Sequence, residues 1–228
     1  MSYDLPPATR ALLIANVVMF LLQLVTGDAS AFGAIHHLGW MTEHLGLWPW
    51  GPDHVGYDGN GNLLHVGFRI WQVVSYGFLH GSVTHIALNM FALFMFGGVI
   101  EKTFGRRHFL IFYFVCLITA GLTQLVVTHF LNNGFYPTIG ASGAIFGLLL
   151  AFGMLYPNER IMLIIPPIPM KAWVFVTGYG IIELAQGVLG TEAGVAYFAH
   201  LGGMLGGFVL IQYWRGKLPI KPRRRLMR

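Results

Sequence analysis

Residues 83–100 read VTHIALNMFALFMFGGVI, a run of 18 residues without a single Asp, Glu, Lys or Arg. A helix of that length is about 27 Å long, close to the roughly 30 Å thickness of the hydrocarbon core of a bilayer. The run therefore predicts a transmembrane helix. It also carries His85 and Asn89, and polar side chains inside a membrane are costly enough to indicate a function.

Five further apolar runs of similar length predict five more transmembrane helices. They are Ala11–Thr26, Phe109–Phe130, Ser142–Tyr156, Ala172–Leu189 and Val195–Tyr213. The composition agrees, because only 10% of the 228 residues are charged and 55% are apolar, whereas roughly a quarter of a soluble domain is charged. The sequence therefore predicts an all-α, polytopic membrane protein with a bundle of six transmembrane helices, and it excludes a soluble cytosolic enzyme.

The positive charges predict how this bundle is oriented. If the N-terminus is cytoplasmic, all of the 14 Lys and Arg residues except Arg69 fall on the cytoplasmic side, which is a strong topological signal. Both termini are then cytoplasmic. We expect one membrane-embedded domain over residues 1–228, with a six-helix core at about 10–215 and a basic tail at 215–228.

The same charges bear on partners. The net charge of +5 is spread over short clusters between apolar runs, and a nucleic-acid reader needs a basic face instead. We therefore expect no nucleic-acid partner. The basic tail is interpreted as a topological anchor that contacts the lipid bilayer, with a dedicated partner site as the alternative.

A long connector, residues 27–81, follows the first predicted helix and lies outside the membrane in this topology. It holds four of the six Trp residues of the chain, which are Trp40, Trp48, Trp50 and Trp71. Indole rings prefer the headgroup level of a bilayer, so part of the connector is expected to lie there. The alternative, a loop packed on the outer ends of the helices, is equally compatible with this pattern.

Four polar side chains fall at one predicted depth in the membrane. Counted from the cytoplasmic end of its helix at 1.5 Å per residue, Ser142 lies about 21 Å up and His200 about 22 Å up. His85 lies about 24 Å up and Asn89 about 18 Å up by the same count. Packing of polar residues near helix ends would explain each one alone. A Ser and a His together in one layer of the outer half instead predict a shared site.

The chemistry that such a set favours is nucleophilic acyl transfer, because a serine hydroxyl becomes a nucleophile beside a histidine base. We expect no acid beside His200 at this depth, so a Ser–His dyad is predicted rather than a triad. Glu183 is the only carboxylate inside an apolar run and away from its ends. It is interpreted as a simple interhelical hydrogen-bonding residue, or alternatively as one that orients a partner or lines a gate.

The tetrapeptide 140–143, Gly-Ala-Ser-Gly, opens a predicted helix. Backbone N–H groups at a helix start lack intrahelical partners and are suited to binding an oxyanion. Gly140 and Gly143 leave room for a substrate backbone and a neighbouring helix. The spacings Gly143-x-x-x-Gly147 and Gly203-x-x-x-Gly207 predict close helix contacts that would bring Ser142 to His200.

Taken together, these motifs resemble those of the rhomboid intramembrane serine proteases. The resemblance rests on HGSVTHIALN at 80–89, GASG at 140–143 and AHLGG at 199–203, and on Glu101 followed by Gly105 and Arg106. It covers about residues 10–215. It implies a hydrolase, multi-pass in a bacterial inner membrane, that cuts other membrane proteins within or beside the outer part of a transmembrane segment. It implies no metal and no cofactor.

The resemblance also implies a role for each motif residue. Ser142 would be the nucleophile and His200 its general base, while Asn89, His85 and the Ser142 backbone N–H would bind the oxyanion. His80 would brace the outer rim. Phe146 takes the place of a Tyr that stacks on the catalytic imidazole in some members.

The sequence departs from the family pattern at one position of the first connector. Trp71-Gln72 stands where many bacterial members carry Trp-Arg, so bracing by that Arg is in doubt.

A non-proteolytic rhomboid-like binding protein remains the alternative, although such a protein would be expected to lack the Ser or the His. A zinc protease would need H-E-x-x-H, which His80 and His85 do not form.

Overall fold

The computed structural model describes residues 5–29, 39–57, 63–131, 135–162, 167–189 and 197–222. All six predicted runs fall on helices. The long helices are α1 (Pro7–Thr26), α4 (Val83–Ala92) continuing through a π-helical turn (Leu93–Gly97) into α5 (Gly98–Phe104), α6 (Arg106–Leu131), α7 (Ser142–Leu155), α8 (Ala172–Leu189) and α9 (Tyr197–Trp214). The predicted helical membrane bundle is confirmed.

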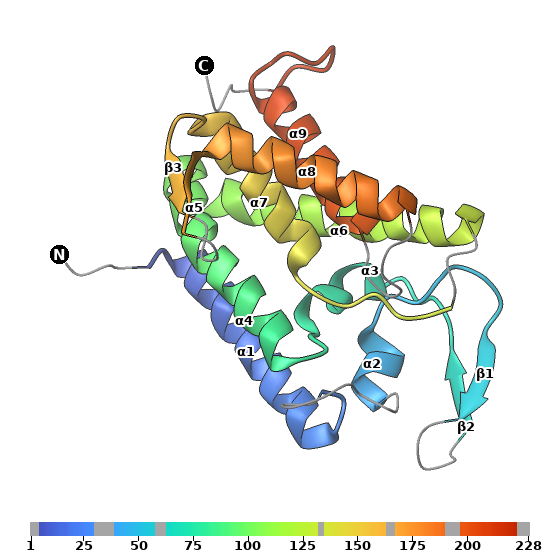
Figure 1. Cartoon of the computed structure of the whole chain (residues 1–228). Helices are drawn as coiled ribbons and strands as arrows, with labels where there is room; N and C mark the ends of the chain where they lie inside the picture. Colours follow the sequence, from blue (N-terminus) through green and yellow to red (C-terminus); the bar gives the residue numbers. More distant parts are fainter. Residues whose placement is uncertain are drawn as a thin grey trace.

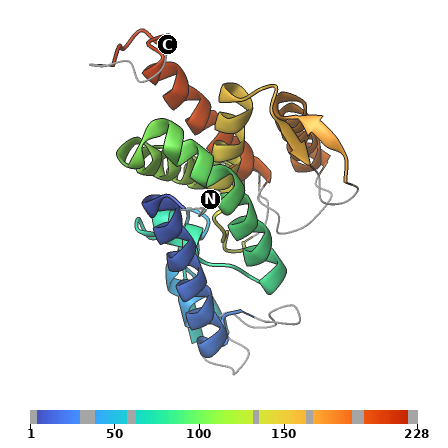
Figure 2. The same cartoon turned by 90° about the vertical axis from the view of Figure 1, so that its left-hand side faces the viewer.

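In the described residues, the connections between these helices contain short elements. They are α2 (Trp40–Leu45), α3 (Gln72–Ser75), a 3₁₀ turn (Tyr76–Phe78) and two antiparallel strand pairs, β1 (His54–Tyr57) with β2 (Leu63–Val66) and β3 (Arg160–Met162) with β4 (Pro169–Lys171). Figures 1 and 2 place α8 and α9 toward one end of the molecule, and α1, α2 and the β1–β2 pair toward the other.

The helices differ in how well they match a bilayer. Four are long and apolar enough to cross one, namely Pro7–Thr26, Val83–Phe104, Arg106–Phe130 and Ala172–Leu189. Helix α7 has only 14 residues, about 21 Å, and α9 has 18 residues that include His200 and Gln212. The predicted start of the sixth run, Val195, lies outside the described residues. The two helices that carry the predicted Ser–His pair are thus the ones that match a bilayer least well.

Helices α7 and α9 touch along glycines. A methyl group added at Gly203 would collide with the backbone carbonyl of Gly143, and one added at Gly147 would collide with the Cys116 side chain on α6. Side chains at these positions would force the helices apart, so the close contact predicted from the two Gly-x-x-x-Gly spacings depends on the missing Cβ atoms. This seam brings the start of α7 close to the first turn of α9.

The start of α1 is held by a buried acid from α5. The Glu101 carboxylate accepts hydrogen bonds from the backbone N–H of Ala8 at 2.9 Å, from that of Thr9 at 2.6 Å and from the Thr9 hydroxyl at 2.8 Å. An anion at a helix N-terminus satisfies the free N–H groups and the helix dipole together. Gly105, whose φ of +76° favours glycine, then ends α5 and allows the turn into α6.

Gln72 braces the first connector from inside. Its side chain is fully buried, and its Oε1 accepts from the backbone N–H of Arg69 at 3.0 Å and of Trp48 at 3.4 Å. Its Nε2 donates to the carbonyls of Gly67 at 3.3 Å and His44 at 3.4 Å. A neutral amide, with both acceptor and donor atoms, thus braces this connector at the position where the resemblance implies an Arg in many members.

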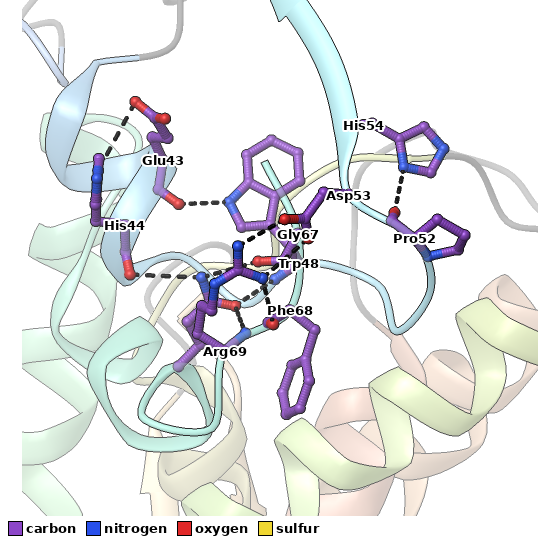
Figure 3. Close-up of polar contacts among 10 residues, drawn as sticks. Glu43, His44, Trp48, Pro52, Asp53, His54, Gly67, Phe68 and Arg69 are labelled. Atoms are coloured by element: carbon purple, nitrogen blue, oxygen red, sulfur yellow. Dashed lines mark hydrogen bonds and ion pairs between the residues drawn. The ribbon is translucent and has the colours of Figure 1, made fainter. Parts of the chain in front are cut away.

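Arg69 takes part in the same corner of the connector. Figure 3 shows its guanidinium bonded to both carboxylate oxygens of Asp53, at 2.9 and 2.7 Å, and to the Phe68 carbonyl at 3.0 Å. The Arg69 hydrogen bonds hold the pKa of the exposed Asp53 carboxyl below its usual value. This pair ties the loop before β1 to the loop after β2.

The four Trp residues of the connector fall into two groups. One is buried inside the loop, and three are exposed as headgroup contact would require. Trp48 is 1% exposed and packs inside the loop, whereas Trp40, Trp50 and Trp71 are 63%, 67% and 53% exposed. Exposed indoles of this kind suit the headgroup region. Headgroup contact therefore stays a prediction for those three, and Trp48 is a packing residue.

Candidate active site

The segment that leads into α7 is fixed on both sides before Ser142 is reached. Thr138 exchanges two backbone hydrogen bonds with Leu47 of the first connector, at 3.0 and 2.9 Å, and the Gly140 N–H donates to the Tyr76 carbonyl at 2.9 Å. Gly140 has a φ of +125°, and a Cβ there would lie 2.8 Å from His85 Nε2. Both the backbone conformation and the close imidazole require glycine at this position.

The structure brings Ser142 and His200 into direct contact. The Ser142 Oγ lies 2.8 Å from His200 Nε2, although the two residues are 58 positions apart in sequence. Ser142 is the first residue of α7, and His200 lies in the first turn of α9. The Phe146 ring, one turn into α7, stacks on the His200 ring with centroids 4.2 Å apart and an interplanar angle of 5°. Phe146, which stands where the resemblance implies a Tyr in some members, therefore makes a parallel stack.

The expectation that no acid lies beside His200 is wrong. The Glu183 Oε2 on α8 lies 2.7 Å from His200 Nδ1, and the two side chains are only 5% and 13% exposed. The predicted interhelical hydrogen bond of Glu183 exists, and its partner is the imidazole itself. The sequence placed Glu183 near the right depth but could not show which face of α8 meets α9. Its isolation as a carboxylate within an apolar run was the available signal.

His85 and Asn89 face the same space from α4. The Gly81 N–H donates to His85 Nδ1 at 3.4 Å, an arrangement that assigns the ring proton to Nε2, the nitrogen nearest Gly140. Asn89 is 6% exposed and lies one helical turn further along. Both side chains carry N–H groups and line the same cavity as Ser142. Their oxyanion role stays a prediction.

The His80 side chain packs against His85 and does not face the space that His85 and Asn89 share. Its side chain is fully buried, its backbone N–H donates to Gln23 Oε1 at 2.9 Å, and its ring meets the edge of the His85 ring at a centroid distance of 4.9 Å. Burial, with the nearby His85 as a smaller cause, lowers the pKa of His80 to about 3. A neutral, buried ring that supports His85 fits the predicted bracing role.

A cavity of about 710 Å³ is bounded by α4, α7, α8, α9 and the 136–140 segment. Its polar members include His85, Asn89, Ser142 and His200, and most of the remaining lining is apolar or aromatic. A mainly apolar pocket with a few convergent polar groups is typical of a binding or catalytic site. In the described part of the chain no three His, Cys, Asp or Glu side chains gather as a metal site would require.

Sequence reasoning missed two further contacts of this site. Tyr179, one turn before Glu183 on α8, packs against Phe146 with ring centroids 5.0 Å apart. The pairing of Thr138 with Leu47 was also not foreseen, because a single bridge between two irregular segments leaves no periodic pattern.

Fold and site together define an integral membrane protein of helical type with a Ser–His pair in a mainly apolar cavity. Residues 67–216 match the profile of the rhomboid domain. Because the match spans well over half of the chain and includes every predicted site residue, the chain belongs to the rhomboid family.

Several characterised relatives are similar over much of the chain. Rhomboid protein 1, mitochondrial, from Saccharomyces cerevisiae is 32% identical over 155 residues, which are 68% of this chain and 44% of that protein. Rhomboid protease GluP from Bacillus subtilis is 29% identical over 206 residues, 89% of this chain and 34% of that protein. Rhomboid protease GlpG from Yersinia pestis is 24% identical over 208 residues, 91% of this chain and 62% of that protein. The chain thus spans between a third and two thirds of the length of these relatives.

Proposed function

We propose that this protein is an intramembrane serine endopeptidase that hydrolyses peptide bonds within or next to the outer part of transmembrane segments. The observation that carries the proposal is the 2.8 Å contact between Ser142 Oγ and His200 Nε2, made inside a cavity of a rhomboid-family helical bundle. Two relatives carry the name rhomboid protease, which supports the same chemistry.

The reaction follows from the positions of the side chains. The Ser142 Oγ attacks the carbonyl carbon of the substrate while His200 Nε2 takes the hydroxyl proton. The negative charge that develops on the carbonyl oxygen is stabilised by donors from Asn89, His85 and the Ser142 backbone N–H. The proton on His200 passes to the leaving amine as the C–N bond breaks, and water then hydrolyses the acyl-enzyme by the same steps.

The orientation of the bundle is part of this proposal, with both termini on the cytoplasmic side. The end of α5, the start of α6 and the end of α9 meet through aromatic rings, because Phe104 and His108 both lie against Trp214, at 5.3 and 5.5 Å. The end of α7 joins them through a 2.7 Å contact between Tyr156 and Thr103. This end of the bundle is the one flanked by most Lys and Arg residues, which supports its cytoplasmic placement.

The test is to incubate the purified protein, in detergent and in liposomes, with a panel of single-span membrane proteins. We expect wild type to release two fragments from at least one of them and Ser142→Ala to release none. A fluorophosphonate probe should label wild type but not Ser142→Ala. Binding of the panel without cleavage by wild type, together with absent labelling, would favour the non-proteolytic alternative.

A further inference from the structure

Three acidic side chains are buried in the described part of the chain, and they differ in what they bind. Asp28 accepts from the Thr42 backbone N–H at 2.8 Å and from the Thr26 hydroxyl at 2.7 Å. Glu101 accepts from the start of α1. Glu183 instead meets the imidazole of His200 at 2.7 Å. Two of the buried acids therefore hold the backbone, and the third holds the base of the proposed reaction.

A buried carboxylate is costly unless it is paired, so its partner indicates why the fold tolerates it. The bond to Glu183 requires a proton on His200 Nδ1. Nε2 is then the nitrogen with a free lone pair, and it faces the Ser142 hydroxyl. The carboxylate thus selects the tautomer that can accept the proton of the nucleophile.

The Phe146 stack cannot make this selection by itself. A flat ring packed at 4.2 Å against the imidazole fixes the plane of the imidazole, but a half-turn of the ring about its bond to Cβ preserves the stack. That half-turn would remove both nitrogens from their partners. The contacts with Glu183 and Ser142 distinguish the two orientations, and of these two partners the carboxylate is the one that requires a proton on Nδ1. Tyr179 on the same helix as Glu183 supports the stack from behind Phe146.

We infer that Glu183 is a positioning residue that makes Ser142, His200 and Glu183 a triad, an inference that rests on the proposed function. It fixes the His200 tautomer and ring orientation, and it stabilises the imidazolium formed when Nε2 takes the Ser142 proton. Glu183 itself takes no proton, since the proton moves from Oγ to Nε2 and then to the leaving amine. The attraction acts across 2.7 Å between side chains that are almost completely buried, where charge pairs are strongest.

The test compares kcat and KM of wild type, Glu183→Gln and Glu183→Asp on one cleaved substrate. Glu183→Gln keeps the shape and loses the charge, so we expect kcat to fall between about 10- and 10⁴-fold, the upper value being that of the acid-to-amide change in a soluble triad. KM should change little, because Glu183 does not reach the substrate. Glu183→Asp should recover part of the kcat lost in Glu183→Gln.

Glu101→Gln is the matched control, since it makes the same chemical change at a buried acid that holds the start of α1, through two backbone N–H groups and the Thr9 hydroxyl. It should lower thermal stability while leaving kcat per folded molecule unchanged. If Glu183→Gln behaves in the same way, with kcat unchanged and only stability reduced, Glu183 is a structural residue and the inference is overturned.

A second readout does not need turnover. Nitrogen-15 NMR of histidine-labelled protein, with the His200 signals assigned by their loss in His200→Ala, should show the Nδ1-protonated tautomer in wild type and a mixed or reversed tautomer in Glu183→Gln. Identical tautomers would overturn the inference even if wild type cleaves no substrate. Failure of the proposed function would appear separately, as a wild type that neither cleaves nor takes the fluorophosphonate.

Discussion

At the residue scale, the proposed reaction needs Ser142 and His200 to act together. Ser142 without His200 lacks a base, and His200 without Ser142 has no proton to accept. We expect Ser142→Ala and His200→Ala each to abolish cleavage, a loss of up to about 10⁶-fold in soluble serine proteases. The double variant should be no worse than either single one. Additive losses in the two single variants, measured as initial rates, would show that the residues act independently.

Asn89 allows a prediction about the oxyanion. Loss of one such donor lowers turnover by roughly 10² to 10³, or about 3–4 kcal/mol of transition-state stabilisation. Asn89→Ala should therefore reduce kcat by this factor while the melting temperature in detergent changes little. If Asn89→Ala instead melts early and its folded fraction cleaves at the wild-type rate, the side chain serves packing alone.

The Ser142–His200 pair and the residues around it were predictable from the sequence, whereas the contact of Glu183 with His200 was not. Ser142, His200, His85 and Asn89 could be found because polar side chains stand out in apolar runs and the depth of each can be counted along its helix. The role of Glu183 could not be found in this way. Depth is a property of one helix, whereas a contact with His200 depends on how α8 is rotated against α9.

At the scale of elements, the α7–α9 seam is the part of the fold that sets the Ser142–His200 distance. A Cβ at Gly203 would meet the backbone carbonyl of Gly143, which cannot move without shifting α7. We expect Gly203→Ala to destabilise the protein by about 1–3 kcal/mol through overpacking and to reduce cleavage by moving His200 away from Ser142. Thermal unfolding and the cleavage rate, measured together, check both effects.

Gly178 on α8 offers the matched control for this substitution. A Cβ at Gly178 meets no atom within 4 Å, and alanine is favoured over glycine inside a helix by up to about 1 kcal/mol. Gly178→Ala should therefore leave stability and cleavage unchanged or raise stability slightly. A Gly203→Ala variant that matches Gly178→Ala in both measurements would show that the seam tolerates a side chain.

Helix positions followed from apolar periodicity and length, but the ends of the helices depend on tertiary contacts. Helix α1 begins at Pro7, earlier than the apolar run predicts, because Glu101 from a distant helix satisfies its first N–H groups. The structure of the first connector depends on Gln72 in the same way. Contacts between residues far apart in sequence leave no local pattern, so these features were not predictable from one sequence.

At the scale of the whole molecule, the short α7 allows a prediction of where a substrate would be cut in the proposed reaction. Ser142 is the first residue of a helix of 14 residues, which is about 21 Å long and so leaves roughly 9 Å of a 30 Å hydrocarbon core beyond it. Hydrolysis needs water, and the nearer aqueous surface in the proposed topology is the outer one. With the proposed function and topology, we therefore expect the cut in the outer part of a substrate span.

A substrate helix protects its carbonyls with its own hydrogen bonds, so it must unwind before a peptide bond can lie beside Ser142. Gly or Pro near the outer end of a substrate span weakens the helix by about 1 to 3 kcal/mol and should speed cleavage. Moving one scissile sequence stepwise toward the cytoplasmic half should slow cleavage sharply, as measured by product formation in liposomes. The matched control keeps the scissile sequence in place and moves only the Gly or Pro. Equal cleavage at every depth, or a preference for the inner half, would contradict the placement of Ser142 near the outer surface and the orientation of the bundle with it.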